Sequence, residues 1–218
     1  KANRTSHNSK RGIGLKKGLD ILLQIKEKFS VPVTSDVHDI SQIRFAKNVL
    51  DIIQIPAFLC RQTDLLIEAG KTGLPVNVKK GQFLAPGDMK NVIKKILSTK
   101  NKKIILTERG TMFGYNHLVT DIKSLPIMKK TGFPVFFDAT HSVQLPGFNN
   151  KSSGGQVEYV AILAKACTTV GIAGLFMETH DDPKNAPSDG QCMIPLKTLG
   201  KLIQSIQLYD NLSKNKHL

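Results

Sequence analysis

Two apolar segments of this sequence, FFDATHSVQ and GLFMETH, end in titratable side chains that an ordinary buried strand would not carry. His141 lies in the first segment, Glu178 lies in the second, and Asp189 lies 11 residues after Glu178. An imidazole combined with two carboxylates suits Mn²⁺, Fe²⁺ or Zn²⁺. The spacing is not in itself a metal signature, so a hydrogen-bonded cluster without an ion stays open. The three residues are a candidate site for a divalent metal.

Cationic side chains end two other apolar segments. Lys79 is the next-to-last residue of PVNVKK, and Arg109 is the next-to-last residue of KIILTERG. Arginine can bind a phosphate through two parallel hydrogen bonds, and lysine adds a compact charge. The pair therefore predicts a site for an anionic substrate, with solvated surface charges as the alternative. Lys79, His141 and Asp189 are the candidate catalytic residues.

The elements that must position these residues alternate between strand and helix. Apolar residues recur at helical spacing in some segments, whereas short runs rich in β-branched residues read as strands. Predicted helices cover 14–29, 63–73, 88–97, 156–171 and 194–212, and predicted strands cover 31–37, 50–58, 75–80, 103–110, 134–141 and 174–180. This alternation predicts a parallel sheet covered by helices.

Two parallel α/β architectures fit the pattern, a doubly wound sheet and a (β/α)₈ barrel. Polar residues at nearly every strand end favour the barrel, because all of those ends meet at its active-site mouth. Eight strands are needed, and about six are visible. We therefore expect a single barrel domain over residues 1–218, with its first strands missing before Lys1.

Composition limits the class of protein. The chain has 218 residues, of which 40% are hydrophobic, so a sizeable core can form. No secretory signal or long apolar run is visible, and the three cysteines form no CxxC pair, so we expect a cytoplasmic, non-membrane protein. A net charge of +14 raises the possibility of nucleic-acid binding. The lysines are spread along predicted helices without aromatic partners, so no nucleic-acid partner is expected.

The motifs together resemble the 3-deoxy-D-manno-octulosonate 8-phosphate synthase family. The resemblance runs from the first residue to about Leu202. The matching motifs are KANRTS, TSDVH, DIIQIPAFLCRQTDLL, NVKKGQF, TERGTMFGYN, FDATHSVQLPG, FMETH and SDG. It implies a (β/α)₈ barrel, a cytoplasmic homotetramer without an organic cofactor, and the condensation of phosphoenolpyruvate with D-arabinose 5-phosphate on the route to lipopolysaccharide.

The resemblance also implies roles for individual residues. Lys79 and Arg109 would hold the phosphate of phosphoenolpyruvate, and Lys1 its carboxylate. The sugar phosphate would meet Asn3, Arg4 and Thr5, where the family more often has serine at the last position. Arg61 would reach the sugar phosphate in an adjacent subunit. The remaining residues expected to line the cavity are Asp36, Gln54, Pro56, Ala57 and Phe58.

The family divides into metal-dependent and metal-independent members. His141, Glu178 and Asp189 match three ligand positions of the metal-dependent class, and the SDGQCM segment favours that class. The deciding cysteine or asparagine would lie before Lys1, so the sequence leaves the choice open. Two further alternatives are the sister enzyme that uses erythrose 4-phosphate, whose opening motif reads KPRT rather than KANRT, and an inactive truncated remnant.

Overall fold

The computed structural model describes residues 7–8, 11–147 and 154–215. Contacts within the chain define two compact units, of which the first includes Lys10–Leu106 and the second Thr107–Leu218. The boundary falls inside one strand, β4 (Ile104–Glu108). The single domain predicted for residues 1–218 stays a prediction.

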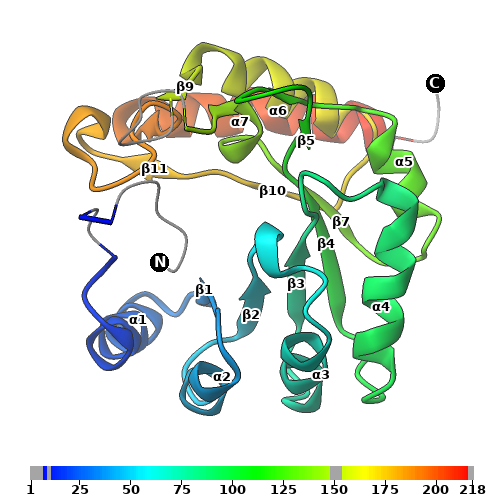
Figure 1. Cartoon of the computed structure of the whole chain (residues 1–218). Coiled ribbons are helices and arrows are strands. Elements are labelled where there is room, and N and C mark those ends of the chain that lie inside the picture. The colour runs from blue at the N-terminus through cyan, green and yellow to red at the C-terminus, as the bar shows by residue number, and fades with distance from the viewer. Residues whose placement is uncertain (1–6, 9–10, 148–153, 216–218) are drawn as a thin grey trace. The chain divides into compact units, whose positions relative to one another are not determined.

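The first unit is a parallel sheet whose strands alternate with helices along the chain (Figure 1). Strands β1, β2, β3 and β4 lie in that order, and the register pairs Thr34 with Ile52 and Ile53 with Val76. The strands before β4 are β1 (Thr34–Asp36), β2 (Ile52–Ile55) and β3 (Val76–Lys79), and the helices are α1 (Leu15–Phe29), α2 (Ile40–Ala46), α3 (Thr63–Lys71) and α4 (Met89–Leu97), with 3₁₀ turns at Ala57–Leu59 and Pro86–Asp88.

Apolar strands and helix stripes build the core of this unit. Ile53, Ile55 and Val78 are fully buried, as expected for parallel strands that are covered on both faces. Helix α4 buries a stripe that includes Val92 and Ile96, which are spaced by about one turn. The strands therefore end at fixed positions, and the polar residues at their carboxyl ends are held in register.

The second unit begins with the last residues of β4, and its strands β7 and β10 pair in parallel. The register places Phe176 beside Asp138. Its elements are β5 (Thr111–Met112), β6 (Leu118–Val119), α5 (Ser124–Lys129), β7 (Val135–Asp138), β8 (Gln144–Leu145), β9 (Gly154–Gly155), α6 (Val160–Thr168), β10 (Gly174–Phe176), β11 (Thr179–His180), β12 (Ile194–Pro195) and α7 (Leu196–Lys214), with 3₁₀ turns at His141–Val143, Val157–Tyr159 and Pro183–Asn185. Helices α6 and α7 pack against each other.

The predicted alternation of parallel strands and helices is confirmed in both units. The predicted strand over 174–180 is two strands, because it leaves the main sheet after Phe176 and residues 179–180 pair with β12 instead. The antiparallel pairs β5–β6 and β8–β9 carry no apolar run and were not predicted. The complete (β/α)₈ barrel stays a prediction.

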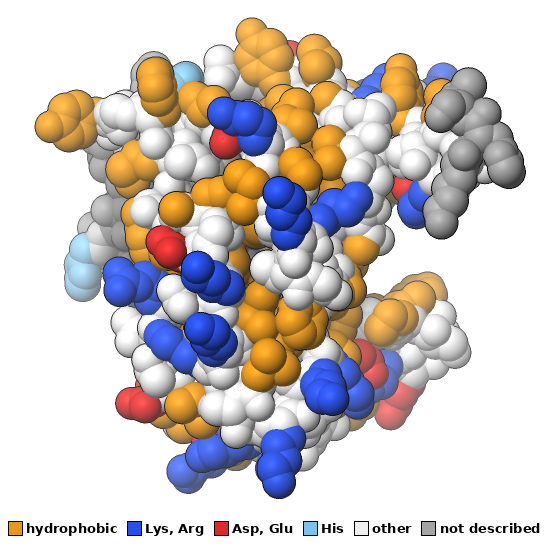
Figure 2. Space-filling model, turned by 90° about the vertical axis from the view of Figure 1, so that its right-hand side faces the viewer, with side chains coloured by type: hydrophobic (Ala, Val, Ile, Leu, Met, Phe, Trp, Pro, Cys, Tyr) orange, Lys and Arg blue, Asp and Glu red, His pale blue; other side chains and the backbone are white. Residues whose placement is uncertain are grey.

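Charged side chains are widely distributed on the surface. Figure 2 shows lysine and arginine side chains scattered over the visible face, with hydrophobic and other groups between them.

Cys60, Cys167 and Cys192 are free and buried. None of the helices in the described ranges combines the length and the apolar character that a membrane crossing requires.

Candidate functional site

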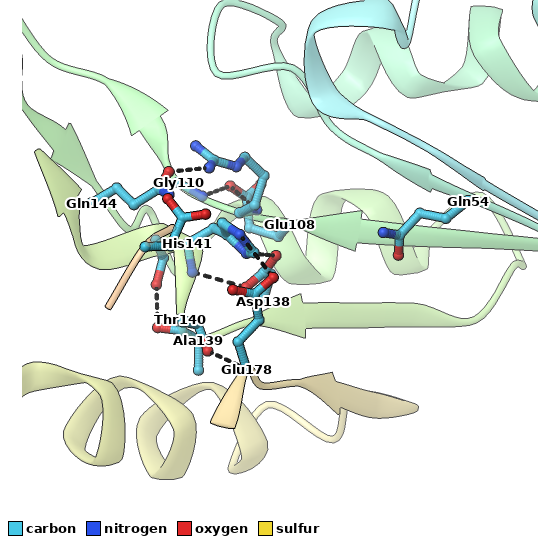
Figure 3. Close-up of polar contacts among 12 residues, drawn as sticks. Gln54, Glu108, Gly110, Asp138, Ala139, Thr140, His141, Gln144 and Glu178 are labelled. Atoms are coloured by element: carbon cyan, nitrogen blue, oxygen red, sulfur yellow. Dashed lines mark hydrogen bonds and ion pairs between the residues drawn. The ribbon is translucent and has the colours of Figure 1, made fainter. Parts of the chain in front are cut away.

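His141 is held by the carboxylate that ends strand β7. Asp138 is fully buried, and its Oδ1 accepts the backbone N–H of His141 at 2.9 Å while its Oδ2 lies 2.7 Å from His141 Nδ1 (Figure 3). Because an ionised carboxylate only accepts hydrogen bonds, Nδ1 carries the imidazole proton. In the neutral imidazole the lone pair is then on Nε2, which lies 3.4 Å from Glu178 Oε1.

Glu178 follows strand β10 and is anchored by its own backbone. Its N–H donates to Thr140 Oγ1 at 2.8 Å, and its carbonyl accepts from the N–H of Ile194 at 3.0 Å. The register between β7 and β10 brings it beside the turn that carries His141. Glu178 Oε2 is buried and has no hydrogen-bond partner among the described residues.

Asp189 completes the cluster from a distant loop. Its backbone is left-handed, with φ 57°, and its carbonyl accepts from the N–H of Cys192 at 2.8 Å. Its Oδ1 accepts from Gln144 Nε2 at 2.8 Å. His141, Glu178 and Asp189 each offer one ligand atom, and these atoms lie within 4.8 Å of one another. The structure thus brings together the three residues that the sequence suggested for a metal.

These three residues fit a divalent cation. The histidine presents an unprotonated nitrogen because a carboxylate holds its other nitrogen, which is the usual arrangement behind a metal-bound imidazole. Glu178 has a buried carboxylate oxygen that a cation would satisfy. His180 is not one of the three described residues whose ligand atoms come together.

Arg109 lies in the same unit at the end of β4. Its side chain is 6% exposed, and its Nη2 donates to Gln144 Oε1 at 2.7 Å. Its Nη1 is buried and, among the described residues, has no acceptor. Burial lowers the pKa of the guanidinium, and the nearby carboxylates of Asp138, Glu108 and Asp189 oppose this effect. A buried guanidinium N–H without an acceptor is a donor for an anionic ligand.

The turn after β4 is shaped by Glu108. This buried carboxylate accepts the N–H groups of Arg109 at 3.1 Å and of Gly110 at 2.9 Å through the same oxygen, Oε1. Gly110 has φ 90°, a conformation that side-chain-bearing residues rarely adopt. The direction in which Arg109 leaves the strand is therefore set by its two neighbours.

A second polar group lies in the first unit, across three adjacent strands. The register aligns Asp36 with Gln54 and Gln54 with Asn77. Gln54 Nε2 donates to Asp36 Oδ1 at 2.7 Å, and Asn77 Nδ2 donates to Gln54 Oε1 at 3.0 Å. Lys79, which is 6% exposed, follows Asn77 by two residues and so shares its face of the strand. Sequence reasoning missed Asn77, although this spacing from Lys79 was a usable signal.

The other predicted residues of the first unit lie beyond β2. Pro56 precedes the 3₁₀ turn, Ala57 is buried, and Phe58 is 54% exposed. Arg61 is exposed, and its carbonyl accepts from Lys95 Nζ at 2.7 Å. Lys1, Asn3, Arg4 and Thr5 lie outside the described residues.

The predicted site residues divide between the two units. Lys79, Asp36 and Gln54 belong to the first, and Arg109 with the three metal candidates belongs to the second. The convergence of Lys79 with Arg109 therefore stays a prediction. Gln144 was missed by sequence reasoning, because a neutral amide in a two-residue strand carries no charge or periodic signal.

Comparison with known proteins gives one consistent family. The model of the DAHP synthetase I family matches residues 1–214. Three relatives bear the name 2-dehydro-3-deoxyphosphooctonate aldolase. The relative from Bartonella bacilliformis is 56% identical over 216 residues, which cover 99% of this chain and 77% of the relative. The one from Rickettsia canadensis is 57% identical over 99% of this chain and 79% of the relative. The relative from Geobacter metallireducens is 58% identical, and the match covers 98% of this chain and 79% of the relative.

The matched region spans nearly the whole chain in each of these relatives. The chain therefore belongs to the DAHP synthetase I family and, within it, to the 2-dehydro-3-deoxyphosphooctonate aldolases, which are also called 3-deoxy-D-manno-octulosonate 8-phosphate synthases.

Proposed function

We propose that this chain condenses phosphoenolpyruvate with D-arabinose 5-phosphate and water, which gives 3-deoxy-D-manno-octulosonate 8-phosphate and phosphate for lipopolysaccharide biosynthesis. The observation that carries the proposal is the 55–58% identity, over at least 98% of the chain, to relatives that bear the corresponding name. These names favour the longer sugar over erythrose 4-phosphate.

Both substrates are anions, so the site must hold them together against their repulsion. We assign Arg109 and Lys79 to the phosphate of phosphoenolpyruvate. Nη1 of Arg109 is buried and has no acceptor within the described part of the chain, which supports this role. We assign Lys1 to the carboxylate of phosphoenolpyruvate, and Asn3, Arg4 and Thr5 to the sugar phosphate. Positioning and charge stabilisation of this kind supply most of the rate gain in a step between two molecules.

We further propose that His141 Nε2 and the carboxylates of Glu178 and Asp189 hold a divalent ion such as Mn²⁺, Fe²⁺ or Zn²⁺, and that no organic cofactor is needed. Such an ion would supply Lewis-acid polarisation of the sugar aldehyde or of the attacking water. His141 has a single lone pair, at Nε2, so it either coordinates an ion or accepts a proton. We assign it to coordination, because Asp138 already holds Nδ1.

In the first unit, we assign the linked side chains of Asp36 and Gln54, with the Pro56, Ala57 and Phe58 turn, to the wall of the substrate cavity. The short hydrogen bond between Gln54 and Asp36 supports a shared, ordered wall. A complete (β/α)₈ barrel, a cytoplasmic homotetramer and the reach of Arg61 to the sugar phosphate of a neighbouring subunit belong to the same proposal, and the family membership supports them.

The deciding experiment measures phosphate release with phosphoenolpyruvate and each aldose phosphate, with and without a chelator. We expect release with arabinose 5-phosphate, and a loss of release in the chelator that added Mn²⁺ reverses. A Lys79→Met variant should lose activity, whereas Lys103→Met, which removes an exposed lysine, should keep it. Release with erythrose 4-phosphate alone would overturn the proposed sugar substrate. Full activity in the chelator would overturn the proposed metal requirement.

A further inference from the structure

Gln144 joins two parts of the second unit that the proposed function treats separately. Arg109 Nη2 donates to Gln144 Oε1 at 2.7 Å, and Gln144 Nε2 donates to Asp189 Oδ1 at 2.8 Å. The partners lie 35 and 45 residues away along the chain. Gln144 is 9% exposed, so water competes little for either bond. One amide therefore connects the guanidinium with the carboxylate of Asp189, which is one of the three candidate cation ligands.

The direction of the amide follows from its partners. A guanidinium only donates hydrogen bonds, so the amide oxygen must face Arg109. The amide nitrogen must then face Asp189, whose ionised carboxylate only accepts. The reversed amide would place two donors together at Arg109 and two acceptors together at Asp189. Arg109 thus determines which atom Gln144 presents to Asp189.

The backbone holds Gln144 in place for this contact. Gln144 begins strand β8, which pairs it with Gly155 of β9, and it directly follows the 3₁₀ turn that carries His141 (Figure 3). The N–H of Gln156 donates to the carbonyl of Val143 at 3.1 Å, next to the amide. The turn at 141–144 therefore supplies a candidate ligand at one end and the connecting amide at the other.

We propose that Gln144 is a positioning residue, through which Arg109 orients the carboxylate of Asp189 for cation binding. The inference rests on the proposed function, because it takes His141, Glu178 and Asp189 as the cation ligands. Hydrogen-bond partners behind metal ligands commonly change metal affinity by about 10- to 100-fold. Gln144 fills that place for Asp189, and its own orientation depends on Arg109.

The test measures Mn²⁺ binding to the full chain, by the electron paramagnetic resonance signal of the free ion. Gln144→Met has a similar length and makes neither hydrogen bond, so we expect its Mn²⁺ affinity to fall about 10- to 100-fold. Gln144→Asn is one methylene shorter and cannot reach both partners, so we expect its Mn²⁺ affinity to fall as well. Unchanged affinity in both variants would overturn the proposal.

Arg109→Met gives a test of sign. Removal of a positive charge near the cluster should by itself strengthen Mn²⁺ binding, whereas loss of the amide's orientation should weaken it. We therefore compare the change in Mn²⁺ affinity that Arg109→Met causes in two backgrounds. The ratio of the affinity after this substitution to the affinity before it should be lower in the native background than in the Gln144→Met background, by about threefold or more. If the affinity changes of the two single substitutions multiply to give the change of the double variant, the inference is overturned.

A control separates positioning from general packing. Asn101 is another buried amide, 8% exposed, which donates to the carbonyls of Gly70 and Leu74 in the first unit. Asn101→Leu should lower the melting temperature and leave Mn²⁺ affinity unchanged. Equal losses of Mn²⁺ affinity in Asn101→Leu and Gln144→Met would assign Gln144 a purely structural role and overturn the proposal.

The outcomes also separate this inference from the proposed function. The measurements use Mn²⁺ alone and need no turnover. Absence of Mn²⁺ binding in the unmodified chain would overturn the inference while phosphate release could still support the synthase. Non-multiplicative effects of the Arg109 and Gln144 substitutions, in a chain that releases no phosphate, would support the inference and count against the proposed function alone.

Discussion

The replacement Asp138→Asn should weaken cation binding at His141 without removing any candidate ligand. Asp138 Oδ1 accepts the backbone N–H of His141, and Oδ2 accepts from its Nδ1. If the new amide keeps its oxygen on the backbone N–H, its nitrogen faces Nδ1 and donates to it. The imidazole proton must then move to Nε2, the nitrogen that lies 3.4 Å from Glu178 Oε1. A protonated Nε2 cannot bind a metal ion.

The alternative orientation of the amide is also unfavourable. It would restore an acceptor for Nδ1, but it would set the amide nitrogen against the backbone N–H of His141. A buried donor left without an acceptor costs about 1–3 kcal/mol. Loss of a hydrogen-bond partner behind a metal ligand costs about 10- to 100-fold in affinity, or about 1.4–2.8 kcal/mol. The two estimates overlap, so we expect Mn²⁺ affinity to fall about 10- to 100-fold by either route.

The assay is a Mn²⁺ titration of Asp138→Asn beside the unmodified chain, with urea unfolding of both as a check on folding. Asp39→Asn is the matched control, because it makes the same chemical change at an exposed helix N-cap whose side chain accepts from the N–H of Ser41. Asparagine caps helices about as well as aspartate, so this control should keep both stability and affinity. Mn²⁺ affinity in Asp138→Asn within about twofold of the unmodified chain would refute the reasoning about the imidazole proton.

Three further predictions concern charge and burial. Arg109→Met should raise the KM for phosphoenolpyruvate by about tenfold or more, since charged hydrogen bonds contribute about 1.5–3 kcal/mol, and steady-state kinetics would test this. Burial raises the pKa values of Cys167 and Cys192 to about 12, so a thiol reagent at pH 8 should label them only after unfolding, and rapid labelling of the folded chain would contradict the buried positions. Burial, opposed by Asp36, lowers the pKa of His38, so the unfolded state binds the proton more readily, and stability should fall as the pH drops below about 6.5. Urea unfolding at several pH values should show this slope in the unmodified chain and a smaller one in His38→Asn.

Much of the fold could be read from pattern, because apolar periodicity reflects burial directly. The strands that end at Lys79, Glu108 and Asp138 all lie within predicted segments. The short pairs β5–β6 and β8–β9 could not be predicted, since two-residue strands leave no periodic signal. The segment 174–180 was misjudged because Thr179 pairs with Ile194, a contact that depends on the path of a later loop.

The candidate site shows the same division. His141 and Glu178 were identified from their chemical types near the ends of apolar segments, and Asp189 was identified as a further carboxylate downstream. The structure brings the three together. The roles of Asp138 and Gln144 became clear only from contacts. A neutral amide has no preferred place in a sequence pattern, and its value depends on which donor and acceptor the surrounding chain puts beside it.

Residue types and their order were therefore enough to identify a parallel α/β chain of the octulosonate phosphate synthase family, to select His141, Glu178 and Asp189 as a candidate metal site, and to select Arg109 as a candidate anion-binding residue. Folding decided how those groups act on one another. The tautomer of His141 follows from the carboxylate of Asp138, and the connection from Arg109 to Asp189 follows from the position of Gln144. The physical reason is that hydrogen bonds are short and directional, so contacts between residues 35 and 45 positions apart exist only once strand register and loop paths are set.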